Sequence, residues 1–230
     1  MPVLSSTKDL TKTYWELRYP LVGKLLPADH EHRLYGAMSR IVPEIHARST
    51  SWRMATIGGD LNGRGEILLT SYSRLRIRVV WEQIPLFLRL VQKLLKVGKH
   101  SLVLEPPEIH PICPSRTLKA RLVVIKGFKE PEPFVGAVKY HLQKLGIENC
   151  QTYVPQNASG EPDRKIIEIH QRKVVGFGVV VTGLNALDSI SLQINSCGGR
   201  AKMGCGFFSP VNSLDLPKNE GDGERESSNA

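Results

Sequence analysis

The sequence is poor in the residues and patterns that mark several common classes of protein. It has four cysteines in 230 residues and no C-x-x-C pair, which argues against a disulfide framework or a structural zinc site. Its longest apolar stretch, residues 174–181, has eight residues, whereas a membrane-spanning helix needs about 20. The opening residues show no charged start followed by an apolar run, so we expect no signal peptide. The expectation is a soluble, cytoplasmic protein with reduced thiols and no membrane partner.

Motifs of two familiar classes of enzyme are also missing. There is no G-x-S-x-G hydrolase motif and no H-x-x-x-H metal motif, and the glycine-rich loop at 198–206 lacks the G-K-[ST] ending of a Walker sequence. We therefore expect neither a metal nor a cofactor. Any cleavage chemistry would depend on side chains that act as acids and bases.

Positive charge is what the sequence has in excess. There are 31 Lys and Arg against 22 Asp and Glu, a net charge of +9. In residues 215–230 five acids oppose two bases, a net of −3, so residues 1–214 carry +12. The polar composition of residues 215–230 predicts a disordered acidic tail. A body this basic suits an RNA or an anionic membrane, although charge alone is equally explained by a solubilising surface.

The hydrophobic pattern predicts an α+β protein in which the order β-α-β-β-α-β occurs twice. We expect two tandem ferredoxin-like (RRM-like) units, at residues 1–112 and 113–214, joined by the proline-rich segment 105–116. In the first unit the pattern predicts strands at 13–19, 67–72, 75–79 and 101–104, and helices at 32–46 and 85–95. In the second it predicts strands at 118–126, 150–154, 166–169 and 174–181, helices at 133–145 and 185–194, and a final strand that begins at 206–208. The arginines of strand 75–79 are expected on an exposed face.

Two groups of residues are candidates for a functional site. One is a glycine-rich loop that comprises Gly198, Gly199, Arg200, Lys202, Gly204 and Gly206. Its glycines bracket two cations and can present backbone N–H groups to a phosphate. A flexible turn with incidental charge is the simpler alternative. Histidines flank the first helix at His30 and His46. Histidine suits proton transfer near neutral pH, yet a histidine at a helix end is more often an ordinary surface residue.

Several short sequences together resemble one known family. They are YWEL at 14–17, LYGAMSR at 34–40, IH at 45–46, SRLRIR at 73–78, VVGFGV at 174–179 and the glycine-rich loop. In this order they resemble the CRISPR-associated endoribonucleases that process precursor crRNA, most closely the Myxan subtype. The resemblance extends from about residue 14 to residue 210.

The resemblance implies a fold, an activity and a site. It implies two ferredoxin-like units and cleavage of CRISPR repeat RNA without a metal, by attack of a 2′-hydroxyl that leaves a 2′,3′-cyclic phosphate and a 5′-hydroxyl. His46 matches the family's histidine at the end of the first helix and is the first catalytic candidate. His30 is the second, and Tyr35 and Ser39 are weaker candidates.

The same resemblance implies RNA contacts and partners. We expect the repeat hairpin to contact the loop and four further cations, Arg172, Lys173, Arg74 and Arg76. The implied partners are the repeat hairpin, the mature crRNA and the subunits of a crRNA-guided complex. Two alternatives remain open: a non-catalytic RNA-binding subunit of such a complex, and a basic RNA-binding module unrelated to CRISPR.

Overall fold

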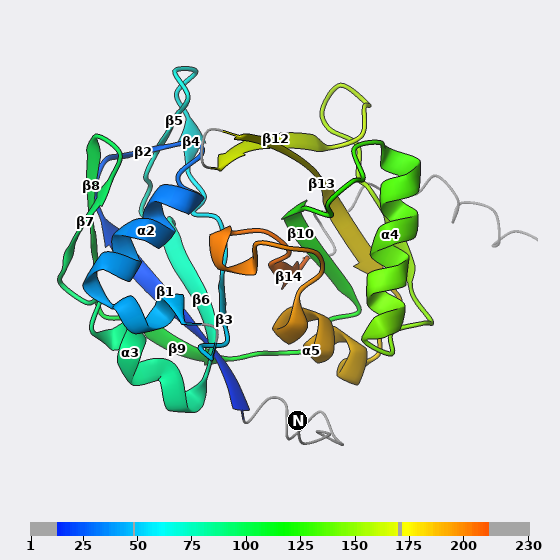
Figure 1. Ribbon diagram of the computed structural model, residues 1–230, viewed down its shortest axis with the longest axis horizontal. Coiled ribbons are helices and arrows are strands. Elements are labelled where there is room, and N and C mark those ends of the chain that lie inside the picture. The colour runs from blue at the N-terminus through cyan, green and yellow to red at the C-terminus, as the bar shows by residue number, and fades with distance from the viewer. Residues whose placement is uncertain (1–12, 48, 170–171, 212–230) are drawn as a thin grey trace, which may run out of the picture.

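In the computed structural model, which describes residues 13–47, 49–169 and 172–211, two α+β domains lie side by side (Figure 1). The segment 215–230, for which the sequence predicts a disordered acidic tail, lies outside the described residues. No helix in the described ranges has the length and apolar content needed to cross a membrane.

The first domain has the strand order of a ferredoxin-like unit. Its sheet runs β3-β6-β1-β8-β7, in which β6 and β8 flank the central strand β1. Taking β1, β3, β6 and β8 as strands one to four gives the order 2-3-1-4. The helices and strands of this domain are β1 (Tyr14–Val22), β2 (Leu25–Pro27), α2 (Glu31–Ile41), η1 (Pro43–His46), β3 (Trp52–Met54), β4 (Asp60–Leu61), β5 (Glu66–Leu68), β6 (Arg74–Val80), η2 (Trp81–Gln83), α3 (Ile84–Leu88), β7 (Leu94–Val97), β8 (His100–Leu104) and β9 (Glu108–Pro111).

The second domain repeats the order with a longer hairpin. Its sheet runs β11-β13-β10-β14, and β12 also pairs with β13. The order is again 2-3-1-4, so the prediction of two tandem ferredoxin-like units is confirmed. The helices and strands of this domain are β10 (Thr117–Val123), α4 (Pro131–Lys144), β11 (Gln151–Tyr153), β12 (Arg164–Ile169), β13 (Arg172–Thr182), α5 (Ala186–Asn195), η3 (Ala201–Met203) and β14 (Phe208–Pro210).

Both predicted helices of the first domain are shorter than expected. The helix predicted at 32–46 ends at Ile41, because Pro43 has no N–H to donate and restricts the backbone of Val42. The helix predicted at 85–95 ends at Leu88. The leucines at 94 and 95 instead lie in β7, where exposed and buried residues alternate. A short apolar run fits both the helical and the strand period, and pairing with β8 decides between them.

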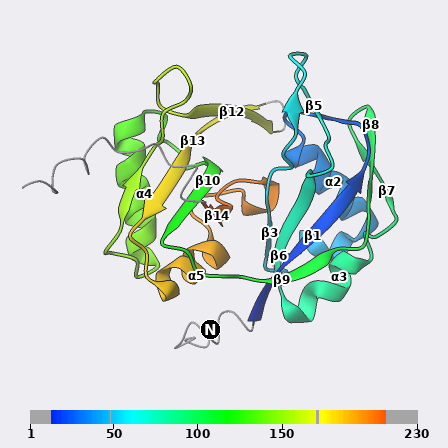
Figure 2. The same cartoon turned by 180° about the vertical axis from the view of Figure 1, so that it is seen from behind.

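The proline-rich connector contains a strand that the sequence pattern did not predict. Its residues 108–111 form β9, which pairs antiparallel with β1 and extends the first sheet. Seen from behind, the chain crosses from the first domain to the second through β9 (Figure 2). A proline is compatible with this strand because Pro111 lies at its end.

The prediction of an exposed basic face on β6 is wrong for Arg78. Its side chain is only 1% exposed and donates to a Glu16 carboxylate oxygen at 2.9 Å. It also donates to two carbonyls of the second domain, those of Gln193 at 3.0 Å and Phe208 at 2.6 Å, and lies 4.1 Å from the ring centroid of Phe207. This face of β6 packs against the other domain, which the alternation of residues in one strand does not reveal.

Candidate active site between the two domains

His46 is presented to solvent at the end of the short helix η1. The helix is anchored by Ile45, which is fully buried, while the neighbouring His46 is exposed. The Ile45 carbonyl accepts a hydrogen bond of 2.9 Å from the indole Nε1 of Trp52 on β3. The turn that follows is held by Thr50, whose hydroxyl donates to the Glu44 carbonyl at 2.7 Å. The backbone on both sides of the histidine is therefore fixed.

Tyr35 orients the His46 ring. Its hydroxyl oxygen lies 2.6 Å from His46 Nδ1. The Tyr35 ring is buried and stacks on Trp52, with centroids 5.9 Å apart and planes at 27°. When Nδ1 carries its proton and donates to Tyr35, Nε2 has a free lone pair and can act as a base. Tyr35 is thus placed as a positioning residue for His46.

The glycine-rich loop of the second domain contacts the same turn. The Lys202 ammonium donates to the carbonyls on either side of His46, those of Ile45 at 3.1 Å and Ala47 at 3.0 Å. It also lies 5.7 Å from the ring centroid of Trp52. Partial burial lowers the pKa of Lys202. In Figure 1 the loop, with η3, lies between the two domains next to α2 and β3.

A cleft of about 650 Å³ opens beside these groups. The described residues that line it include three cations and no carboxylate: Tyr35, Ser49, Thr50, Ser51, Trp52, Arg53, Arg200, Ala201, Lys202 and Met203. Burial lowers the pKa of Arg53, but a guanidinium remains charged at neutral pH. Its Nε is buried without a hydrogen-bond partner in the described part of the chain. A histidine at the edge of a cationic cleft is an arrangement suited to proton transfer on a phosphodiester.

Three glycines of the loop are required by close packing. A Cβ added to Gly198 or Gly206 would lie 2.4 Å from a backbone carbonyl oxygen, and one added to Gly204 would lie 2.9 Å from Glu31 Cγ and Thr56 Oγ1. Nothing lies within 4 Å of a Cβ added to Gly199. The glycine pattern follows from the fold of the loop, and the phosphate contact expected from it stays a prediction.

Arg200 lies in the same loop with an unusual backbone. Its φ is +67°, in the left-handed region that non-glycine residues seldom adopt. Such a conformation costs about 1–3 kcal/mol and is often found at functional sites. The Arg200 side chain is exposed and lines the cleft.

The structure argues against His30 as a catalytic residue. The ring is fully buried: Nδ1 lies 2.9 Å from the Pro27 carbonyl, and Nε2 accepts from the Ile57 amide at 3.1 Å. Both ring nitrogens are used to join backbone segments of the core, and burial lowers the pKa of His30. His30 is therefore a structural histidine. The weaker candidate Ser39 likewise has a buried hydroxyl.

Of the other predicted RNA-contacting cations, Arg74, Arg76 and Lys173 do not line the cleft beside His46. Lys173 is exposed next to Arg172, the first residue of β13. Arg74 donates to the Ser71 and Ser73 carbonyls, and Arg76 forms a hydrogen-bonded ion pair with Glu16 at 2.9 Å. Arg74 and Arg76 line a different cleft. The tertiary structure thus groups Arg200 and Lys202 with His46 and Tyr35, and it does not bring Arg74 or Arg76 there.

Sequence reasoning missed two residues of the site, Trp52 and Arg53. They lie on the three-residue strand β3, where Trp52 supports both Ile45 and Tyr35, and Arg53 lines the cleft. No motif marks this strand, and only its position next to η1 indicates a role. In the described ranges no group of three or more His, Cys, Asp or Glu side chains is arranged to hold a metal ion.

The two domains with a glycine-rich loop docked between them define a tandem ferredoxin-like class of fold. A solved structure of a CRISPR associated protein Cas6 matches with a TM-score of 0.57 at 16% identity, over 87% of this chain and 99% of that one. A Cas6-related protein from Pyrococcus furiosus matches with a TM-score of 0.60 at 11% identity, over 87% and 99%. These likenesses concern the fold.

Sequence comparison gives the family. The Cas6 family (Cas6 Crispr) matches residues 15–213. The CRISPR-associated endonuclease Cas6 of Myxococcus xanthus (strain DK1622) is 34% identical over 195 residues, which are 85% of this chain and 80% of the relative. The chain therefore belongs to the Cas6 family, and the resemblance drawn from its motifs is confirmed.

Proposed function

We propose that this protein is an endoribonuclease that cleaves CRISPR repeat RNA in precursor transcripts, with His46 as its catalytic acid–base group. The observation that carries the proposal is the 2.6 Å contact between Tyr35 Oη and His46 Nδ1, beside a cleft whose described lining includes three cations and no carboxylate. Membership of the Cas6 family and the named endonuclease relative support the substrate class. The repeat hairpin and the mature crRNA are the proposed partners, and subunits of a crRNA-guided complex would receive the product.

The geometry suits cleavage by the RNA's own 2′-hydroxyl. His46 Nε2 takes the 2′-hydroxyl proton while Nδ1–H donates to Tyr35, and the 2′-oxygen attacks the adjacent phosphorus. The bond from phosphorus to the 5′-oxygen breaks, and that oxygen takes up a proton, from the imidazolium or from water. The products are a 2′,3′-cyclic phosphate and a 5′-hydroxyl. Lys202, Arg200 and Arg53 supply positive charge where the phosphorane develops negative charge.

In this scheme the protein itself supplies the proton-transfer group and the positive charge. A general acid–base group contributes about 10²–10⁴-fold to the rate. Tyr35 acts only through the histidine, because its hydroxyl is already bonded to Nδ1. No step in this scheme requires a metal ion, and we propose that cleavage proceeds without one.

The test is cleavage of a CRISPR repeat RNA by the purified protein in EDTA. We expect His46→Ala to lower the single-turnover rate by about 10²–10⁴-fold and to leave the affinity for the repeat unchanged. A 2′-deoxy nucleotide before the cut should block the reaction, and the upstream product should end in a cyclic phosphate. His110→Ala is the matched control, because His110 is also solvent-accessible but pairs with Glu108 outside the cleft.

Three results would contradict the proposal in separate ways. Normal cleavage by His46→Ala would remove the assigned role of this histidine. Loss of wild-type cleavage in EDTA would contradict the metal-independent chemistry. If the wild type bound repeats tightly without cleaving them, the remaining interpretation would be a non-catalytic RNA-binding subunit.

A further inference from the structure

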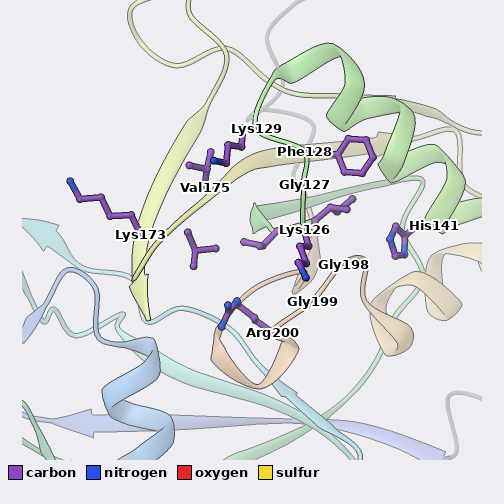
Figure 3. A pocket seen from close by; sticks show the side chains of 13 residues that line it. Lys126, Gly127, Phe128, Lys129, His141, Lys173, Val175, Gly198, Gly199 and Arg200 are labelled. Carbon is purple, nitrogen blue, oxygen red and sulfur yellow. The ribbon is translucent and has the colours of Figure 1, made fainter. Parts of the chain in front are cut away.

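A second hollow lies next to the candidate active site, within the second domain. It has a volume of about 820 Å³ and is formed by the turn after β10, the start of β13 and the glycine-rich loop, with His141 of α4 at one side (Figure 3). This size is within the range of small-molecule binding sites, about 300–1,000 Å³. The proposed chemistry at His46 makes no use of this hollow.

The wall of the hollow is apolar and holds an unpartnered aromatic ring. Val124 and Ile125 are buried beneath it, and Val175 packs against the core of the domain. Phe128 is 37% exposed and belongs to none of the hydrophobic clusters that the described residues form. An exposed ring above an apolar wall offers a surface on which a flat aromatic group can stack.

The rim of the hollow is cationic. Lys126, Lys129, Lys173 and Arg200 all contribute to it and are exposed (Figure 3). No Asp or Glu is among the described residues that line it, and within the described chain none of these four cations forms an ion pair. An apolar wall under a cationic rim complements a nucleotide, whose base is flat and apolar on its faces and whose phosphates are negative.

Arg200 joins this hollow to the cleft beside His46, because it lines both. Lys202, which contacts the carbonyls around His46, is two residues away along the loop. Two residues of extended chain span at most about 7 Å. The two hollows are therefore close enough for an RNA strand with a phosphate in the cleft to reach the second hollow over Arg200.

We propose that this hollow, termed here the Phe128 pocket (Val124–Lys129, Lys173–Val175 and Gly198–Arg200), holds one unpaired nucleotide of the substrate close to the cut. The base stacks on Phe128 and its phosphates lie against the lysines of the rim. This inference rests on the proposed RNA substrate, but not on catalysis by His46. It makes the Phe128 pocket a determinant of which repeats bind, separate from the chemical step.

The experiment measures the affinity of His46→Ala protein, for which we expect cleavage about 10²–10⁴-fold slower, for repeat RNAs in which each nucleotide in turn is replaced by an abasic one. Stacking of a base on an aromatic ring corresponds to roughly a 5- to 150-fold change in affinity. We expect Phe128→Ala to weaken binding of the intact repeat by that amount. In the protein that retains Phe128, we expect an abasic nucleotide at one position outside the base-paired stem to weaken binding by a similar factor. At that position, Phe128→Ala and the abasic nucleotide together should lower the affinity no more than either change alone.

Tyr153→Ala is the matched control, because Tyr153 is also 37% exposed but lies on β11, outside the Phe128 pocket. It should bind all the RNAs like the parent protein. The proposal is overturned when Phe128→Ala binds the intact repeat with parental affinity, or when its effect adds to that of every abasic position. A wild-type protein that binds repeats without cutting them would count against the proposed function and leave this binding experiment valid.

Discussion

Glu16 is the carboxylate on which the domain interface depends, and its ionisation is expected to control stability in acid. Its side chain is 4% exposed and bonded to the guanidinium groups of Arg18, Arg76 and Arg78. Burial alone would raise the pKa of Glu16, but Arg78 and Arg76 outweigh it and hold the pKa at about 2. Arg78 in turn is bonded to two carbonyls of the second domain, so that Glu16 supports the contact between domains.

The size of the effect follows from this pKa. The difference between the ordinary value of 4.5 and about 2, at about 1.4 kcal/mol for each pKa unit, amounts to about 3 kcal/mol. Above pH 5 the full stabilisation is present. As the pH falls from 5 towards 2 the unfolded chain takes up a proton that the folded chain does not, so stability is lost. Glu16→Gln should therefore cost about 3 kcal/mol at pH 7 and little near pH 2.

The assay is urea unfolding of the wild type and Glu16→Gln at a series of pH values from 7 to 2.5. Trp15, Trp52 and Trp81 are the three tryptophans of the chain and all lie in the first domain, so their fluorescence reports on that domain. Other carboxylates titrate in both proteins and cancel in the difference. Glu44→Gln is the control, because its pair with Arg89 is half-exposed and screened by solvent, so we expect its loss to change stability little at any pH. The reasoning is refuted when the difference between wild type and Glu16→Gln does not change with pH.

Two further predictions concern the site itself. Gly204→Ala should destabilise the protein by about 1–3 kcal/mol, because Gly204 has a φ of +79° and no room for a Cβ. Gly199→Ala should change thermal stability little, because a Cβ there meets nothing within 4 Å. Equal losses of stability in the two variants would contradict this account of the loop. Tyr35→Phe should lower the single-turnover rate of RNA cleavage by about 10-fold or more, with unchanged affinity and an altered pH–rate profile. The control is Tyr19→Phe, which loses a hydrogen bond to the Phe87 carbonyl and should leave the cleavage rate unchanged. A Tyr35→Phe enzyme with the wild-type rate and pH profile would show that the contact to His46 has no part in the chemistry.

The elements that are predicted most accurately are those with a clear hydrophobic pattern along the sequence. The run at 174–181 lies within β13, which pairs on both sides, and the helix predicted at 185–194 matches α5 with Asn185 as its N-cap. Local rules suffice where the apolar residues of an element fit only one period. They failed at residues 94 and 95, where two leucines fit either period and the pairing of β7 with β8 decides.

The candidate site was predictable only in part. His46, Tyr35 and the cations of the loop are visible as motifs, but their meeting requires contact between residues about 155 positions apart. In the sequence both His30 and His46 are catalytic candidates, and only the family resemblance ranks His46 first. The structure separates them, because the fold buries one ring between two backbone partners and exposes the other.

The sequence by itself determined the fold class, the excess of positive charge and the family, because periodicity, composition and motif order are properties of the chain read along its length. The tertiary structure decided which charges are available. Arg76 and Arg78 alternate along β6 as an exposed basic face would, yet they are bonded to Glu16, and Arg78 is buried against the second domain. Lys202 lies beside His46 because the loop of one domain docks on the other. Burial and pairing across a domain interface depend on surfaces that form only after each domain has folded, and no local pattern encodes them.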